Sequence, residues 1–151
     1  MSTGHLGSRI CPSCGKTNRV PARNLSDTGR CGSCQTALPP LSSPLEVDAS
    51  GFDEVIQSAR VPVFVDFWAA WCGPCRLAAP EVEALARETA GTAVILKVDT
   101  ERNADLANRY GIQSIPNFMV FLSGRVVSQH AGLAPRSEMR RWMEQAAAKT
   151  T

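Results

Sequence analysis

The 151-residue chain lacks the features of several large protein classes. No stretch approaches the roughly 18 uninterrupted apolar residues that a membrane-spanning helix needs, so we expect no transmembrane segment. The N-terminal ten residues, MSTGHLGSRI, lack the charged start and apolar core of a secretory signal, which predicts a cytoplasmic protein. The formal net charge of +2 is too small to indicate nucleic acid or a membrane surface as a partner.

Charge and proline divide the chain into two parts. Residues 1–40 hold five basic residues and one acidic residue, whereas residues 45–151 hold eleven basic and thirteen acidic residues. Between them lie Pro39, Pro40 and Pro44, and such a proline-rich segment cannot form a helix or a central strand. We therefore predict a module over residues 1–38, a semi-rigid linker over residues 39–44 and a domain over residues 45–151.

The chain has six cysteines, and all of them fall in three C-x-x-C pairs. The first two pairs lie in the N-terminal part, which has few large apolar side chains and no aromatic residue for stacking on bases. A segment of about 40 residues rarely folds without a disulfide, a bound metal ion or a partner. Two closely spaced thiolate pairs match the tetrahedral coordination of one zinc ion, which would supply the missing folding energy. The predicted ligands are Cys11, Cys14, Cys31 and Cys34. Two disulfides, free thiols and an iron–sulfur cluster are the alternatives.

The remaining 107 residues alternate between strand-like and helix-like patterns, which predicts an α/β domain. We expect a first helix at residues 52–59 with Ser50 and Asp53 placed to cap its start. A second helix should begin near Cys72, with Leu77 among the residues of its inner face. We expect strands at residues 61–68, 93–98, 117–122 and 125–130, a short helix at residues 104–110, and a last helix after Pro135.

The third pair, Cys72 and Cys75, lies between an apolar strand and the start of a helix. Free backbone N–H groups and the helix dipole stabilise an anion at a helix N-terminus, so a thiolate there has a lowered pKa and is reactive. The second cysteine follows one turn later, where it can form a disulfide with the first. This arrangement favours redox chemistry over a zinc half-site or two inert core cysteines.

The run from Val65 to Cys75, VDFWAAWCGPC, resembles the active-site sequence of the thioredoxin family. The resemblance covers about residues 45–148 and includes Pro80, the Ile115-Pro116 pair and Gly132. It implies the thioredoxin fold, a central mixed sheet flanked by helices, preceded here by a small zinc-ribbon-like module. The whole chain resembles a bacterial branch of the family that carries four extra N-terminal cysteines.

The resemblance implies a protein-disulfide reductase. Cys72 would attack the substrate disulfide and Cys75 would resolve the mixed disulfide. Asp66 would act as a general base toward Cys75, with Lys97 as its partner. Substrate would bind a surface formed by Trp71, Gly73, Pro74, Ile115, a cis Pro116 and Gly132. Asn117 departs from the threonine that usually follows this proline, while His130 is expected to be an ordinary surface residue of its strand.

The same resemblance implies the partners. Electrons would come from NADPH through a thioredoxin reductase, since the chain has no G-x-G-x-x-G fingerprint of its own. The protein would be a cytoplasmic monomer that acts on disulfide-containing proteins, needs no organic cofactor and is induced under oxidative stress. A zinc-dependent redox sensor and a chaperone-like binding protein are the alternative functions.

Overall fold

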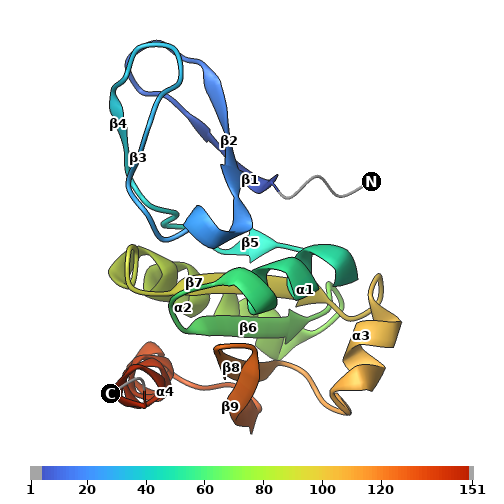
Figure 1. The fold of residues 1–151 in the computed structure, drawn as a ribbon. Helices are drawn as coiled ribbons and strands as arrows, with labels where there is room; N and C mark the ends of the chain where they lie inside the picture. Colours follow the sequence, from blue (N-terminus) through green and yellow to red (C-terminus); the bar gives the residue numbers. More distant parts are fainter. Residues whose placement is uncertain (1–4, 150–151) are drawn as a thin grey trace.

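A five-stranded mixed sheet with the strand order β5-β7-β6-β8-β9 organises most of the chain in this computed structural model, which describes residues 5–149 (Figure 1). Strands β5, β6 and β7 run parallel, whereas β8 and β9 are antiparallel to their neighbours. The strands of the sheet are β5 (Leu45–Glu46), β6 (Val63–Trp68), β7 (Val94–Asp99), β8 (Asn117–Leu122) and β9 (Arg125–Ala131). The helices are α1 (Ala49–Ser58), α2 (Gly73–Glu88), α3 (Ala104–Arg109) and α4 (Arg136–Ala148). The predicted thioredoxin-type architecture is therefore confirmed.

Alternate residues of the central strands point to opposite faces of the sheet, and each face has its own core. Helices α1 and α3 cover one face, where Phe52 and Leu106 pack against Val65. Helices α2 and α4 cover the other face, where Val82 and Met139 pack against Phe64. Both faces of the sheet are thus covered by helices, as is usual where a sheet contains parallel strands.

Two expectations about the helices are wrong. The N-cap of α1 is Asp48, whose carboxylate accepts a hydrogen bond from the Gly51 N–H at 2.8 Å, so neither Ser50 nor Asp53 caps the helix. Leu77 is 67% exposed, because the inner stripe of α2 passes through Cys75 and Ala78 and continues through residues 82, 85 and 86. The side chain one position away from this stripe points outward, although it is larger and more apolar than alanine.

The N-terminal module consists of two small hairpins joined by a short 3₁₀ helix. Its elements are β1 (His5–Ile10), β2 (Thr17–Pro21), η1 (Ala22–Asn24), β3 (Gly29–Arg30) and β4 (Ala37–Leu38). Strand β1 pairs with β2, and β3 pairs with β4, both antiparallel. Arg9 of β1 holds the segment that connects the hairpins, since its guanidinium donates hydrogen bonds of 2.9–3.1 Å to the carbonyl oxygens of Asn24, Leu25 and Asp27.

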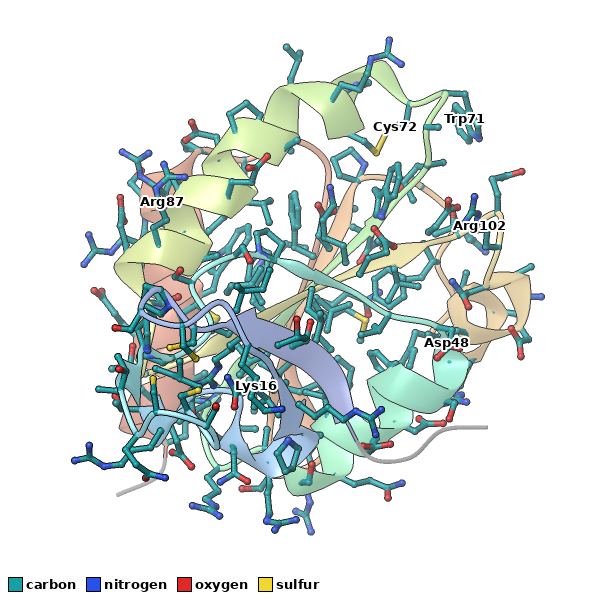
Figure 2. All side chains as sticks on the ribbon, turned by 90° about the horizontal axis from the view of Figure 1, so that it is seen from above. Lys16, Asp48, Trp71, Cys72, Arg87 and Arg102 are labelled. Atoms are coloured by element: carbon teal, nitrogen blue, oxygen red, sulfur yellow. A yellow bond between two sulfur atoms is a disulfide. The ribbon has the colours of Figure 1, made fainter. Side chains whose placement is uncertain are left out.

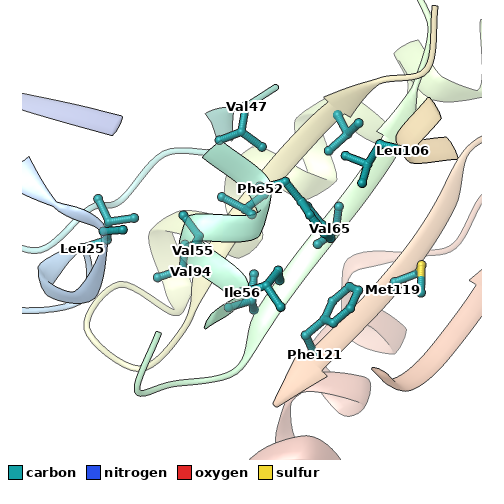
Figure 3. Packing of buried hydrophobic residues seen from close by; sticks show 14 of the residues in the cluster. Leu25, Val47, Phe52, Val55, Ile56, Val65, Val94, Leu106, Met119 and Phe121 are labelled. Carbon is teal, nitrogen blue, oxygen red and sulfur yellow. The ribbon is translucent and has the colours of Figure 1, made fainter. Parts of the chain in front are cut away.

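The module packs on the domain through apolar residues. Leu25 is 1% exposed and belongs to the same cluster as Phe52 and Val55 of α1, as Figure 3 shows. In the predicted linker, Leu41 packs against this cluster and donates its N–H to the Leu25 carbonyl at 2.9 Å. The N-terminal part, which has few apolar residues of its own, therefore completes a core that it shares with α1.

Candidate functional site

Cys72 and Cys75 lie where the loop after β6 enters α2 (Figure 2). Cys72 is the N-cap of the helix, and its sulfur accepts a hydrogen bond from the Cys75 N–H at 3.2 Å. The two cysteines form a disulfide and are 3% and 4% exposed. The Cys72 sulfur is thus held against the donor groups of the first helical turn, which stabilise a thiolate once the disulfide is reduced.

Ile115 and Pro116 lie next to this disulfide, although more than forty residues separate them from Cys72 in sequence. The peptide bond between them is cis, as the resemblance implies. The Ile115 carbonyl oxygen is 3.6 Å from the Cys72 sulfur. The Gly132 N–H donates a hydrogen bond to the Pro116 carbonyl at 2.9 Å, which holds the end of β9 next to the cis peptide bond. Four of the predicted positions, Cys72, Ile115, Pro116 and Gly132, are therefore brought together.

The surroundings of the disulfide expose apolar surface. Trp71 is 67% exposed and lies beside Cys72 in Figure 2. Together with Ile115 it lines a shallow pocket of about 350 Å³. Gly73 and Pro74 form the first turn of α2, and Leu133, which follows Gly132, is 52% exposed. Exposed apolar side chains around a reactive group are typical of a site that receives another protein.

Asp66 lies in the middle of β6 and is 1% exposed. Its Oδ1 atom has no hydrogen-bond partner among the described residues. Burial raises the pKa of Asp66 to about 7, while the positive charge of Lys97 acts in the opposite direction. Desolvation therefore outweighs the charge of the lysine at this carboxylate. Lys97 is the register neighbour of Asp66 on β7, and its ammonium lies 4.7 Å from the centre of the Trp68 ring.

A residue that the sequence did not single out lies beside this pair. Glu46 accepts a hydrogen bond from the Trp68 indole N–H at 3.2 Å and is the register neighbour of Lys97 on β5. Strand β5 has only two residues, which is too short for an alternating pattern to be recognised in the sequence. In the sequence, only its position two residues before Asp48 could have drawn attention to Glu46.

His130 lies on β9 beneath α4. Its imidazole stacks on Trp142 with 3.7 Å between ring centres and 3° between the planes. Desolvation lowers the pKa of His130. His130 is therefore part of the packing between β9 and α4, and it is less exposed than the ordinary surface residue that the sequence predicts.

The four remaining cysteines meet at one end of the module (Figure 2, yellow atoms near Lys16). The sulfur atoms of Cys11, Cys14, Cys31 and Cys34 all lie within 4.8 Å of one another. Between the hairpins, the Cys11 and Cys34 sulfur atoms are 3.5 Å apart and those of Cys14 and Cys31 are 3.6 Å apart. Zinc–sulfur bonds of about 2.3 Å in a tetrahedron set the sulfur atoms about 3.8 Å apart, so this cluster has suitable dimensions for zinc.

Both turns of the cluster have the same hydrogen bonds. The Ser13 N–H lies 3.4 Å from the Cys11 sulfur, and the Ser33 N–H lies 3.4 Å from the Cys31 sulfur. Such N–H groups stabilise thiolates, and the donors from Cys34 and Ser33 help to lower the pKa of Cys31 to about 6. Each turn ends with a left-handed residue, Gly15 at φ +78° and Gln35 at φ +67°. The two C-x-x-C turns therefore form equivalent halves of one site, and the residues present fit a metal ion that prefers thiolates.

Two known protein families match separate parts of the chain. The family described as "Thioredoxin" matches residues 43–145, and the family described as "Thioredoxin 2, N-terminal" matches residues 10–36. No helix among residues 5–149 is long and apolar enough to cross a membrane. The two matches correspond to the five-stranded domain and to the two-hairpin module.

Individual relatives agree with these matches. "Thioredoxin C-3" of Corynebacterium nephridii is 35% identical over 136 residues, which are 90% of this chain and 92% of that protein. "Thioredoxin C-2" of the same organism is 44% identical over 62% of this chain and 87% of its own length. The solved structure of a mutant thioredoxin from Halobacterium salinarum superposes with a TM-score of 0.66 at 33% identity, covering 70% of this chain and 92% of that one. With a family match over residues 43–145 and the Cys72–Cys75 pair at the start of α2, the chain belongs to the thioredoxin family and is a thioredoxin-type disulfide oxidoreductase.

Proposed function

We propose that this protein reduces disulfides of other proteins in a reducing cytoplasm, with Cys72 and Cys75 as its dithiol. One observation supports this most strongly: the Cys72 sulfur caps α2 and lies 3.6 Å from the Ile115 carbonyl, beside the cis peptide bond. A nucleophile and a segment that can bind an extended peptide are thus adjacent. The Gly-Pro pair between the cysteines favours a reductant, because it adds no group that stabilises the thiolate further.

The reaction has two exchange steps. The Cys72 thiolate attacks one sulfur of the substrate disulfide, which forms a mixed disulfide and releases the other sulfur as a thiolate. The Cys75 thiolate then attacks the Cys72 sulfur, which releases the second substrate thiolate and leaves the Cys72–Cys75 disulfide. Two electrons pass from the protein to the substrate. A thioredoxin reductase that uses NADPH would return two electrons to the disulfide.

Asp66 would accept the Cys75 proton in the second step. The support is its burial in β6, the strand that leads into the dithiol loop, and its pKa of about 7, which lets it take up and release a proton near neutral pH. Lys97 would stabilise the charged form of Asp66 and keep its pKa from rising further. Both roles are carried over from the family onto residues that adjoin in the sheet.

Substrate would bind over Trp71, Gly73, Pro74, Ile115, Pro116 and Gly132. The exposed Trp71 indole offers apolar contact area, and backbone groups at Ile115 offer hydrogen bonds to an extended strand. We infer that the protein works as a monomer, because the exposed apolar groups around the dithiol are then free for substrate.

We further propose that Cys11, Cys14, Cys31 and Cys34 hold one zinc ion. When bound, the ion supplies folding energy to a module whose own apolar residues are few. The two equivalent turns and the 4.8 Å limit on all sulfur separations support this assignment. The ion lies in a different part of the chain from the dithiol, so we assign it a structural role.

The test is the reduction of insulin, coupled to NADPH oxidation by a thioredoxin reductase. Wild-type protein should catalyse turnover, and Cys72→Ser should reduce it to the uncatalysed background. Unchanged turnover by Cys72→Ser would overturn the proposed function. Prevention of aggregation by Cys72→Ser, with reduction absent in both proteins, would instead favour a chaperone-like binding protein.

A further inference from the structure

Three charged side chains form a row across the α2 face of the sheet. Glu46 on β5 is the register neighbour of Lys97 on β7, and Lys97 is the register neighbour of Asp66 on β6. Register neighbours on adjacent strands point to the same face of a sheet. The lysine therefore stands between two carboxylates, one at the exposed edge of the sheet and one buried at its centre.

Trp68 connects the two ends of this row. It follows Asp66 by two residues on β6, so its side chain lies on the same face. Its indole N–H donates to Glu46 Oε2 at 3.2 Å, and the Lys97 ammonium lies 4.7 Å from its ring centre. Glu46 thus contacts the indole on which the ammonium rests and also shares a strand register with that lysine. These contacts make the position of Lys97 depend on Glu46.

Few charged groups act on Asp66. Lys97 acts from β7 and Glu46 from β5, and their charges have opposite effects on its pKa. The β8 neighbour of Asp66 is the apolar Phe118, and the buried Cys75 of α2 is held in the disulfide and does not titrate in the oxidised protein. A surface pocket of about 700 Å³ lies at the outer end of the row, lined by Glu46, Trp68 and Asp99 among others. Water can therefore reach Glu46 and the indole at this end.

We propose that Glu46 is a positioning residue for the proton step at Asp66, because it shares Lys97 with the buried carboxylate and anchors Trp68 beneath the ammonium. This inference rests on the proposed role of Asp66 as the proton acceptor of Cys75. In that step the Cys75 S–H bond breaks and the proton joins the Asp66 carboxylate. The Cys75 sulfur then attacks the Cys72 sulfur of the mixed disulfide, which breaks the bond to the substrate and releases the substrate sulfur as a thiolate. Glu46 acts through Lys97 and does not contact the sulfur atoms.

The test measures the midpoint pH of the Asp66 titration in three variants. The chemical shift of the Asp66 carboxyl carbon is monitored by ¹³C NMR in the oxidised full-length protein. Glu46→Gln keeps an oxygen acceptor for Trp68 but removes the negative charge, so the Asp66 midpoint should fall. Because Glu46 is exposed and solvent screens its charge, we expect a shift on the order of half a pH unit. Lys97→Gln should move the midpoint upward. Glu83→Gln, the same charge change on the exposed side of α2, should leave it in place.

The pH profile of insulin reduction gives the second readout, since its acid limb should shift in the same direction in Glu46→Gln. An unchanged Asp66 midpoint in Glu46→Gln, or an equal shift in Glu83→Gln, would overturn the inference. The titration requires no turnover, so its failure leaves the proposed function intact if Cys72→Ser is inactive. Activity of Cys72→Ser would instead refute the proposed function, whatever the Glu46 result.

Discussion

The two cysteine-containing regions share one spacing, C-x-x-C, but have different local structures. In the module, the N–H two residues after the first cysteine points to its sulfur, as in Ser13 to Cys11 at 3.4 Å. At α2, the N–H three residues after the first cysteine does so, as in Cys75 to Cys72 at 3.2 Å. The first geometry is a hairpin turn that leaves both sulfurs free to face a second turn. The second is a helical turn that joins the two sulfurs to each other.

The difference shows that the element carrying the pair decides its chemistry. Two hairpin turns that face each other supply four thiolates at distances suited to one tetrahedral metal ion. One helix N-terminus supplies a single stabilised thiolate with a partner one turn away, which is suited to reversible disulfide exchange. Substitutions in each region should therefore affect disulfide exchange and metal binding separately.

Cys75→Ser should convert the enzyme into a trap. Cys72 can still attack a substrate disulfide, but no second thiolate can resolve the mixed disulfide. Insulin turnover should fall to background, and a covalent complex sensitive to dithiothreitol should accumulate on non-reducing gels. The double variant Cys72→Ser/Cys75→Ser is the control and should form no complex. A complex in the double variant would mean that the module's cysteines exchange with substrate.

Cys31→Ser should abolish stable zinc binding, because it removes one buried ligand from the four-sulfur cluster. Apparent zinc-binding free energies in small zinc modules are about 10–16 kcal/mol, so loss of the ion should unfold the hairpins. Zinc content should fall from one ion per chain to near zero, and amide exchange should accelerate over residues 11–38. Ser33→Ala, whose backbone N–H still points to Cys31, should retain the ion. Full zinc content in Cys31→Ser would refute the assignment.

Asp66→Asn should change how stability depends on pH. The folded-state pKa of Asp66 is about 7, above its ordinary value of 3.8, so the folded chain binds this proton more tightly than the unfolded chain. The stability of wild type should therefore fall, relative to the variant, as pH rises from about 4 to about 7. The full difference is about 4 kcal/mol above pH 8. Urea unfolding of both proteins at pH 5 and pH 8 should show about 3 kcal/mol of this difference, because part of it develops below pH 5. Parallel stability curves would contradict the raised pKa.

Leu25→Ala should test the docking of the module. Leu25 is 1% exposed against α1, and truncation of a buried leucine costs about 2–5 kcal/mol. Ile10→Ala is the matched control, since Ile10 is 69% exposed in the same module and should change stability by less than about 0.5 kcal/mol. Thermal unfolding and zinc content should be measured together. Equal stability of the two variants would mean that the module contributes nothing to the shared core.

The sequence predicted the dithiol well because its signals are local. A cysteine pair after an apolar strand, with proline in the first helical turn, predicts a helix N-terminus directly. The cis bond at Pro116 agrees with what the family resemblance implies, and Asp66 is buried within an otherwise apolar strand. The spacing of the other four cysteines likewise predicted a common cluster.

The missed features depend on contacts between segments. Glu46 lies on a two-residue strand, so only its pairing with β7 reveals that it faces Lys97. Leu25 has no periodic neighbours in the sequence, and its burial depends on α1. The inner stripe of α2 includes Ala78 in place of Leu77, because the position on the helix determines burial more than side-chain size does. Such features require the tertiary structure.

The most direct test of the division between the two regions is time-resolved alkylation of the freshly purified, reduced protein, followed by mass spectrometry with parallel zinc counting. We expect one zinc ion per chain, fast labelling of Cys72, and slow labelling of Cys11, Cys14, Cys31 and Cys34 until a chelator removes the ion. Absence of zinc, with labelling of the four module cysteines as fast as that of Cys72, would contradict it.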